Sequence, residues 1–292
     1  MDVLKKLEEY LDRSWKKDKE GFNSSSVAIS ENGNYYYSGI FESKTHILNI
    51  PSEQGAIVIA VANRDPKIKE IITLVREGEE KFTPNPLVIK FLVDHALRTG
   101  SPFSYKVYNQ EGRLVFFSDN IFELLPFYKP KIEPLEKIKD WKPKPNKVLF
   151  DNSKPLDRQL LFYAKLGAET HFTSKTKSLY GSSVLSQGYI YFAGVYSSFD
   201  YRLGLHSEMV ASLSALMDGN KEITHLCLVS TKFEKEVPQL CGVCRQFLIE
   251  IQQKTKVPIK VICFSWDERK KFEIELENYL PYAWDSKKVE RG

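Results

Sequence analysis

An internal repeat constrains the fold of this chain more than any other feature of its sequence. The segment Tyr36–Phe41 (YYSGIF) precedes Ile50–Gln54 (IPSEQ), and Tyr191–Tyr196 (YFAGVY) precedes Leu205–Met209 (LHSEM) at the same distance and without a gap. Self-similarity at a fixed spacing indicates that one structural unit occurs twice. The 292 residues are enough for two domains of ordinary size.

Strands alternate with helices in both copies. In the first copy the sequence predicts a helix over 1–19, strands at 23–29, 35–41, 103–108 and 114–117, and a helix after Glu53. In the second it predicts helices over 156–166, from the His-Ser-Glu segment and from the Cys-x-x-Cys segment, and strands at 182–185, 189–195, 225–230, 259–264 and 271–274. This alternation is typical of α/β domains whose sheet is covered by helices.

Two stretches rich in proline and lysine, 129–134 and 141–145, separate the copies. Alternating proline and lysine favours an extended, solvated segment. We therefore expect a first domain over residues 1–128, a linker over 129–150 and a second domain over 151–292. An arm that binds nucleic acid is the other interpretation of the linker.

Composition narrows the class of protein. The net charge of +4 is mild and does not by itself indicate nucleic-acid binding. No apolar run approaches the ~20 residues that span a bilayer, and the N-terminus lacks an apolar signal core. Four cysteines do not make a disulfide framework, and Cys227 and Cys263 lie in strand-like apolar runs typical of buried thiols. We expect a cytoplasmic protein with no membrane partner.

Two segments of the second copy carry metal-binding side chains: His206 with Glu208, and Cys241 with Cys244. Each lies at the start of a predicted helix. Cysteines three residues apart on the first turn place their sulfurs side by side, and the positive end of the helix favours thiolate. His206 and Glu208 are two residues apart, so they can serve one site only if His206 precedes the regular helix, which Gly204 makes feasible. One imidazole, two thiols and a carboxylate are the groups of a catalytic zinc site.

The first copy lacks these ligands. Pro51 stands where His206 stands, and alignment through the following Phe-Leu places Asn85 and Val88 at the positions of the cysteines. Only Glu53 remains from the set. We expect the first copy to be a structural partner domain.

The motifs of the second copy resemble those of known enzymes. His-x-Glu followed by Cys-x-x-Cys, with the glutamate outside the metal shell, is the signature of zinc nucleobase deaminases. The run from Cys241 to Gln246 (CGVCRQ) resembles the cytidine deaminase family in particular. A Cys-x-x-Cys alone is also compatible with a redox pair or with half of a structural zinc site.

The resemblance implies a three-layer domain with a mixed five-stranded sheet, in which the two metal-bearing helices lie side by side. Larger members of the family pair an active with a degenerate copy and dimerise, so a homodimer is implied. In those members the active copy comes first, whereas here it comes second. The implied function is zinc-dependent deamination of cytidine, deoxycytidine or a related compound in pyrimidine salvage.

The resemblance also assigns roles to the site residues. His206, Cys241 and Cys244 hold zinc, which acidifies a water molecule, and Glu208 moves protons between that water, the ring and the leaving amine. Arg245 would hydrogen-bond sulfur and moderate the charge of the two thiolates, and a surface helix residue is the alternative interpretation.

Substrate recognition departs from the family. Cytidine deaminases usually carry Gly-x-Asn-x-Glu before the metal ligand to bind the ribose hydroxyls, but here Tyr196 stands in the Asn position and Ser198 in the Glu position. The proline that usually precedes the first cysteine is Leu240. The sugar is therefore bound differently, or the substrate is not a free nucleoside. Tyr196, Phe199 and Asp200 are candidates to line the pocket, and a packed loop is the alternative.

Two further functions remain open. A deaminase acting on a base in RNA or single-stranded DNA would replace the lost ribose contacts by backbone contacts. A non-catalytic scaffold would need a fourth protein ligand, with Cys263 or His225 as candidates. We otherwise expect His225 to be a core or edge histidine of its strand and His171 to lie in a solvated loop.

Overall fold

The computed structural model describes residues 3–16, 23–45, 48–76, 83–128, 130, 134–173, 178–281 and 283. The chain divides into two compact units. Unit 1 contains Met1–Glu42, Ile50–Lys144 and Ser198–Gly204, and unit 2 contains Ser43–Asn49, Pro145–Ser197 and Leu205–Gly292. The predicted domain boundaries at residues 128 and 151 stay a prediction.

Unit 1 is built on a five-stranded sheet in the order β2-β1-β3-β4-β5. The β3 and β4 strands are parallel and the other neighbours are antiparallel. Its elements are α1 (Val3–Arg13), β1 (Ser24–Ser30), β2 (Tyr35–Gly39), α2 (Ser52–Ala62), β3 (Ile68–Val75), α3 (Pro86–Thr99), β4 (Ser104–Asn109), β5 (Leu114–Ser118) and the short 3-10 turns η1 (Ile121–Leu124) and η2 (Glu136–Ile138).

Unit 2 has the same connectivity with one strand added, in the order β11-β10-β9-β7-β8-β6. The β9 and β10 strands are parallel, as β3 and β4 are in unit 1. Its elements are β6 (Lys147–Leu149), α4 (Leu156–Ala168), β7 (Tyr180–Ser186), β8 (Tyr189–Gly194), α5 (Ser207–Met217), β9 (Ile223–Ser230), α6 (Gly242–Thr255), β10 (Lys260–Phe264), β11 (Lys271–Glu275) and α7 (Leu276–Tyr279). The 3-10 turn η3 (Tyr201–Leu203) belongs to the segment that unit 1 contains.

The predicted fold class, two α/β units with helix-covered mixed sheets, is confirmed. The sixth strand of unit 2 was not predicted, because β6 lies within the segment expected to be a linker and pairs antiparallel with β8. Another part of that segment is anchored through Leu135 and Ile138, which are both buried. Residues 129 and 131–133 of the expected linker lie outside the described residues.

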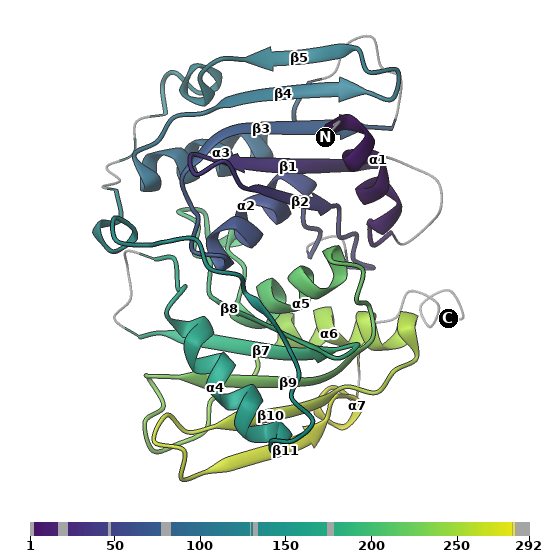
Figure 1. The fold of residues 1–292 in the computed structure, drawn as a ribbon, viewed down its shortest axis with the longest axis vertical. Coiled ribbons are helices and arrows are strands. Elements are labelled where there is room, and N and C mark those ends of the chain that lie inside the picture. Colours follow the sequence, from purple (N-terminus) through teal and green to yellow (C-terminus); the bar gives the residue numbers. More distant parts are fainter. Residues whose placement is uncertain are drawn as a thin grey trace. The chain divides into compact units, whose positions relative to one another are not determined.

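Alternation along the strands assigns the two faces of each sheet. In unit 1, Val27 and Ile29 of β1 pack against Leu7 and Leu11 of α1, whereas Ser26 faces the other way and hydrogen-bonds α2. Successive side chains of a strand point to opposite faces, so α1 and α2 cover opposite faces of this sheet (Figure 1).

Unit 2 repeats this arrangement with α4 on one face and α5 with α6 on the other (Figure 1). Ser183 of β7 donates from its hydroxyl to the carbonyl of Leu160 in α4, at 2.7 Å. Its neighbour Ser182 faces α5 instead. The approach of α4 to the sheet requires Gly181, because a Cβ at this position would clash with the backbone of α4 at Ala164.

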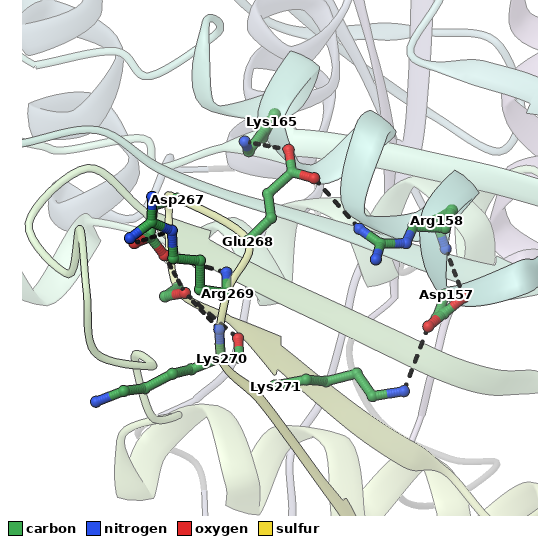
Figure 2. Close-up of polar contacts among 9 residues, drawn as sticks. Asp157, Arg158, Lys165, Asp267, Glu268, Arg269, Lys270 and Lys271 are labelled. Carbon is green, nitrogen blue, oxygen red and sulfur yellow. Dashed lines mark hydrogen bonds and ion pairs between the residues drawn. The ribbon is translucent and has the colours of Figure 1, made fainter.

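A network of ion pairs joins the loop between β10 and β11 to α4 (Figure 2). Glu268 has a left-handed backbone (φ 65°), and its carboxylate contacts Lys165 at 2.6 Å and Arg158 at 3.3 Å. Asp157 of α4 contacts Lys271 of β11 at 3.3 Å. Exposed ion pairs contribute at most about 1 kcal/mol each to the free energy of folding. This network therefore adds only a small part of the free energy that holds α4 against the sheet.

Each unit is completed by a short segment from the other half of the sequence, at equivalent positions of the repeat. In unit 2, the buried carboxylate of Glu250 in α6 accepts hydrogen bonds from the Ser43 hydroxyl and the Lys44 N–H, both at 3.0 Å. In unit 1, the buried Asp94 of α3 accepts one from the Ser198 hydroxyl at 3.3 Å. Ser43 and Ser198 occupy equivalent positions in the repeat. The two segments that each belong to the other half's unit are therefore related by the internal symmetry of the chain.

None of the helices in the described part of the chain combines the length and the hydropathy that crossing a bilayer requires. The expected burial of Cys227 and Cys263 is confirmed, and both thiols are free.

Candidate metal centre

The backbone at the start of α5 brings His206 and Glu208 to one site. His206 is the residue before the first helical turn and has an extended backbone (φ −71°, ψ 157°). Glu208 follows two residues later in the first turn of α5. On a regular helix, residues two apart lie on opposite sides. Because His206 lies outside the regular helix, its side chain and that of Glu208 can face the same site.

The start of α6 positions the two thiols in the same way. Cys241 precedes the first turn with an extended backbone, and its sulfur accepts a hydrogen bond from the Cys244 N–H at 3.4 Å. This is the bond that a capping side chain makes at a helix N-terminus. Cys244 lies three residues later and is fully buried, whereas Cys241 is partly exposed.

His206, Cys241 and Cys244 converge on one point. The Cys241 and Cys244 sulfurs are 3.4 Å apart, and the Nδ1 of His206 lies 3.4 Å from the first sulfur and 3.2 Å from the second. A tetrahedral zinc, with bonds of about 2.3 Å to sulfur and about 2.0 Å to nitrogen, separates its ligand atoms by about 3.5–3.8 Å. The triangle is a few tenths of an ångström tighter than that, so the three donors fit a zinc ion after a small expansion.

Among the described residues, no fourth histidine, cysteine, aspartate or glutamate joins this group. Cys263 lies buried on β10 and His225 is partly buried on β9, where its Nδ1 contacts the Thr224 hydroxyl. The described chain therefore offers three ligands, the number that leaves one position for water or substrate in a catalytic zinc site.

Electrostatics at the site favour a thiolate next to an imidazolium when no metal is bound. The hydrogen bond from Cys244 lowers the pKa of Cys241 to about 4, with a further contribution from His206. The hydrogen bond with Cys241 in turn raises the pKa of His206 to about 9. Sharing a hydrogen bond with Cys241, together with burial, raises the pKa of Cys244. Zinc binding requires neutral imidazole and thiolate, so the metal would displace protons from His206 and Cys244.

Glu208 is buried beside the three donors, with 4% of its surface exposed. Burial raises the pKa of its carboxyl above the usual range. The Ser207 hydroxyl donates to its Oε2 at 3.1 Å, and the Ser207 oxygen is 2.7 Å from the oxygen of Ser182. The Oε2 of Glu208 is thus hydrogen-bonded to Ser207, which in turn contacts Ser182 on the sheet.

A cavity of about 330 Å³ opens in front of the group. This volume lies within the range typical of small-molecule sites. Its walls combine apolar and neutral polar side chains with the metal-binding group and are formed by His171, Tyr180, Val195, Ser197, His206, Glu208, Leu228, Gln239 and Cys241. No lysine or arginine occurs among the described residues that line it.

The three residues proposed from sequence as substrate contacts lie elsewhere. Tyr196 is buried and stacks on Phe172 with ring centroids 5.0 Å apart. Its backbone pairs with Leu205, which fixes its side chain away from the cavity. Phe199 and Asp200 belong to the segment in unit 1, where Asp200 forms an ion pair with Lys90 at 3.0 Å. None of these three lines the cavity.

The neighbours of Tyr196 line the cavity in its place. Val195 and Ser197 are both cavity residues, on either side of Tyr196 in sequence. This is the alternation of an extended segment, in which Tyr196 faces away from the side taken by its two neighbours.

His171 was expected in a solvated loop, and that prediction is wrong. The residue is 3% exposed and lines the cavity, and its Nδ1 accepts a hydrogen bond from the Tyr180 N–H at 3.3 Å. A neutral His171 ring therefore carries its proton on Nε2. No sequence signal marked this position, because residues 172–179 separate His171 from the strand that it contacts.

Arg245 contacts the backbone around the metal centre. Its Nε donates to the carbonyl of Leu240 at 2.8 Å, and its Nη1 donates to the carbonyl of Tyr279 at 3.3 Å. The guanidinium also lies 3.8 Å from the centre of the Tyr279 ring. These contacts hold the residue before Cys241 in place, and a direct interaction of Arg245 with the sulfurs stays a hypothesis.

Unit 1 has the same backbone geometry without the ligands. Pro51 precedes α2 with the extended conformation that His206 has before α5 (φ −58°, ψ 151°). Asn85 caps α3 as Cys241 caps α6, and its side chain accepts from the Leu87 N–H at 2.9 Å. Val88, three residues after the cap, is buried like Cys244. The positions assigned from sequence are thus structurally equivalent, and their side chains cannot bind this metal.

Comparison with solved structures returns cytidine deaminases. The chain is similar to the enzyme from Burkholderia pseudomallei, with 21% identity over 44% of this chain and 98% of that chain and a TM-score of 0.40. The enzyme from Mycobacterium tuberculosis gives 20% identity over 45% and 99% with a TM-score of 0.37, and that from Bacillus anthracis 17% over 47% and 95% with a TM-score of 0.35. The chain matches no protein-family model, and no curated protein sequence matches it.

Proposed function

We propose that unit 2 is a zinc-dependent hydrolase that deaminates a cytosine-type nucleoside, cytidine, deoxycytidine or a related compound, to the uracil form with release of ammonia. The observation that carries this proposal is the position of a buried carboxylate, Glu208, beside three convergent metal donors at the end of a small-molecule cavity. A purely structural zinc site needs four protein ligands and no such carboxylate.

His206, Cys241 and Cys244 would hold the zinc ion. When bound, zinc lowers the pKa of a coordinated water toward about 7, which supplies hydroxide at neutral pH. Glu208 accepts the proton that this water gives up and delivers it to the ring nitrogen next to the amino-bearing carbon. The oxygen that gave up this proton bonds to the amino-bearing carbon. The same carboxylate then carries the remaining proton of that oxygen to the amino group, so that the carbon–nitrogen bond breaks, ammonia leaves and a carbonyl remains.

Burial of Glu208 suits this role. A carboxyl removed from water has a raised pKa, which makes it a better proton acceptor than a solvated one. The apolar walls at Val195 and Leu228 would exclude bulk water from the ring, and Tyr180 offers an aromatic surface for it.

The cavity favours a neutral small molecule over a polynucleotide. Its described lining holds no lysine or arginine, the side chains that bind phosphates most strongly. The Asn/Glu pair that binds ribose in cytidine deaminases is absent, and Ser197 and Gln239 are two of the uncharged polar side chains in the lining that could replace it. A cytosine-type nucleoside that hydrogen-bonds with uncharged side chains fits this lining best. A homodimer and a cytoplasmic location in pyrimidine salvage complete the proposal.

The test is ammonia release from cytidine, deoxycytidine and cytosine by the zinc-loaded protein. Glu208→Gln should reduce kcat by about 10²–10⁴-fold with no loss of bound zinc, because it removes the proton carrier but keeps the volume. Glu53→Gln is the matched control, since it changes the equivalent buried glutamate in the unit without ligands. Zinc-loaded protein that is silent on all three substrates, or a Glu208→Gln variant as active as the parent, would refute the proposal.

A further inference from the structure

A hydroxyl pair connects the sheet of unit 2 to the carboxylate of Glu208. Ser182 lies in β7 and Ser207 in the first turn of α5, and neither side chain is exposed. Their oxygens are 2.7 Å apart, and the Ser207 hydroxyl donates to the Oε2 of Glu208 at 3.1 Å. No other part of the mechanism described above uses these two residues.

The number of protons fixes the direction of this chain. Each serine has one O–H to donate. When Glu208 is a carboxylate, Ser207 gives its proton to Oε2 and so can only accept from Ser182. The Ser182 hydroxyl therefore donates to Ser207, and the two aligned bonds strengthen each other in a buried setting.

Unit 1 contains the same pair in a different context. The Ser26 and Ser52 oxygens are 2.8 Å apart, and Ser52 donates to the Oε2 of Glu53 at 3.3 Å. There the other oxygen, Oε1, is held as well, by the hydroxyls of Tyr105 at 2.8 Å and Thr73 at 3.2 Å. The glutamate of unit 1 thus accepts hydroxyl donors at both oxygens.

The strand registers identify the counterparts of these two donors in unit 2. Thr73 pairs with Ser26 across β1 and β3, and Leu228 pairs with Ser182 across β7 and β9. Following the parallel strands in the same way, Tyr105 corresponds to Val261. Apolar side chains therefore replace both hydroxyls in unit 2, and one of them, Leu228, is a wall of the cavity.

We propose that Ser182 and Ser207 are positioning residues that hold Oε2 of Glu208, so that its Oε1 faces the cavity and exchanges protons with water and substrate. This inference rests on the proposed function for its kinetic consequence, but the orientation of the carboxylate is a property of the chain itself. The hydrogen bonds given above for these serines lead to Glu208 and not to the metal donors, so the serines act through Glu208.

The test compares Ser207→Ala and Ser182→Ala with Ser183→Ala. Ser183 is the matched control because it is equally buried on the same strand and also donates one hydroxyl hydrogen bond, but to the carbonyl of Leu160 on the opposite face. For each variant we would measure zinc content, kcat and KM with cytidine, and the position of the Glu208 carboxylate in a crystal structure of the full chain.

Ser207→Ala should lower kcat by about tenfold to a hundredfold, the kinetic equivalent of losing one hydrogen bond to a charged group. Ser182→Ala should lower it by only about threefold, because it acts through Ser207. KM and zinc content should stay at the parent values, and Ser183→Ala should keep kcat within about twofold. In the crystal, Glu208 should rotate or split between conformers in Ser207→Ala and stay fixed in Ser183→Ala.

The two readouts separate this inference from the proposed function. Zinc-loaded parent without deaminase activity would refute the function, and the crystal structures would then decide alone on the serines. A Glu208 carboxylate that keeps its position in Ser207→Ala would overturn the inference whether or not the parent is active. Equal loss of kcat in Ser207→Ala and Ser183→Ala would overturn it too, since it would reflect general destabilisation.

Discussion

His95 makes the stability of unit 1 depend on pH in a way that the structure quantifies. The residue lies in α3 with no exposed surface, and its Nε2 donates to the carbonyl of Pro66 at 2.7 Å. Burial lowers the pKa of His95 to about 4, against the opposing effect of the Pro66 hydrogen bond and with a further lowering by Arg98. The unfolded chain titrates near the ordinary value of about 6.5.

The sign follows from the proton count. Above pH 6.5 neither state of the chain binds the proton, and the contribution of His95 to stability is complete. Between pH 6.5 and 4 the unfolded state binds a proton that the folded state does not, so stability falls as pH falls. A shift of about 2.5 pH units corresponds to a loss of about 3 kcal/mol by pH 4, and to about 2.5 kcal/mol at pH 4.5.

Urea unfolding of the parent and of His95→Gln, at a series of pH values between 7 and 4.5, measures this loss. Glutamine can donate to Pro66 but does not titrate, so the variant should lose about 2.5 kcal/mol less than the parent over this range. A chelator should be present throughout, because zinc affinity also falls with pH. His225→Gln is the control, since burial also lowers the pKa of that histidine but leaves its side chain partly exposed. Identical pH dependence in the parent and His95→Gln would refute the reasoning.

Three further predictions concern the packing of α4 on its sheet, the contact of the Ser43–Asn49 segment with α6, and metal binding. Gly181→Ala should destabilise the chain by about 3 kcal/mol, because its Cβ meets the backbone of α4; a change below about 0.5 kcal/mol in urea unfolding would contradict this. Glu250→Ala should lower the free energy of unfolding by about 2–5 kcal/mol, because the Ser43 hydroxyl and the Lys44 N–H lose their buried acceptor. Glu222→Ala, at an exposed position, is the control and should change the free energy of unfolding little in the same urea experiment. Free zinc at 100 times its Kd should stabilise the parent by about 2.7 kcal/mol, and Cys244→Ser should abolish most of this gain in thermal unfolding.

The features that sequence predicted are those encoded locally. The repeat aligns Pro51 with His206, each the residue before a helix. In the same way, Asn85 and Cys241 occupy the same capping position before α3 and α6. Helix ends and strand alternation depend on neighbouring residues, so pattern reasoning was able to locate them. The convergence of His206 with the cysteines joins the starts of two separate helices, and it was inferred from the set of donors together with the family resemblance.

The features that sequence missed depend on which side chain faces which way, or on distant partners. Tyr196 and Ser197 are adjacent, and only the pairing of Tyr196 with Leu205 decides that Ser197 lines the cavity. The assignment of Ser43–Asn49 to unit 2 depends on Glu250, more than 200 residues away. Such a contact leaves no periodic trace in the sequence, although Ser43 and Ser198 occupy equivalent positions in the repeat.

The comparison of the two copies indicates what the first has lost besides its ligands. In unit 1, the hydroxyls of Tyr105 and Thr73 bind Oε1 of Glu53, the oxygen that in Glu208 we assign to proton transfer. A carboxylate held at both oxygens stabilises its surroundings but is poorly placed to carry protons, because each transfer must first break a buried hydrogen bond. Introducing histidine and two cysteines at Pro51, Asn85 and Val88 should therefore create a metal site without deaminase activity. Adding Tyr105→Val and Thr73→Leu should be required before activity appears, measured in a chain whose own Cys244 is replaced by serine. Activity from the three ligands alone would show that the hydroxyls around Glu53 are not what keeps this copy silent.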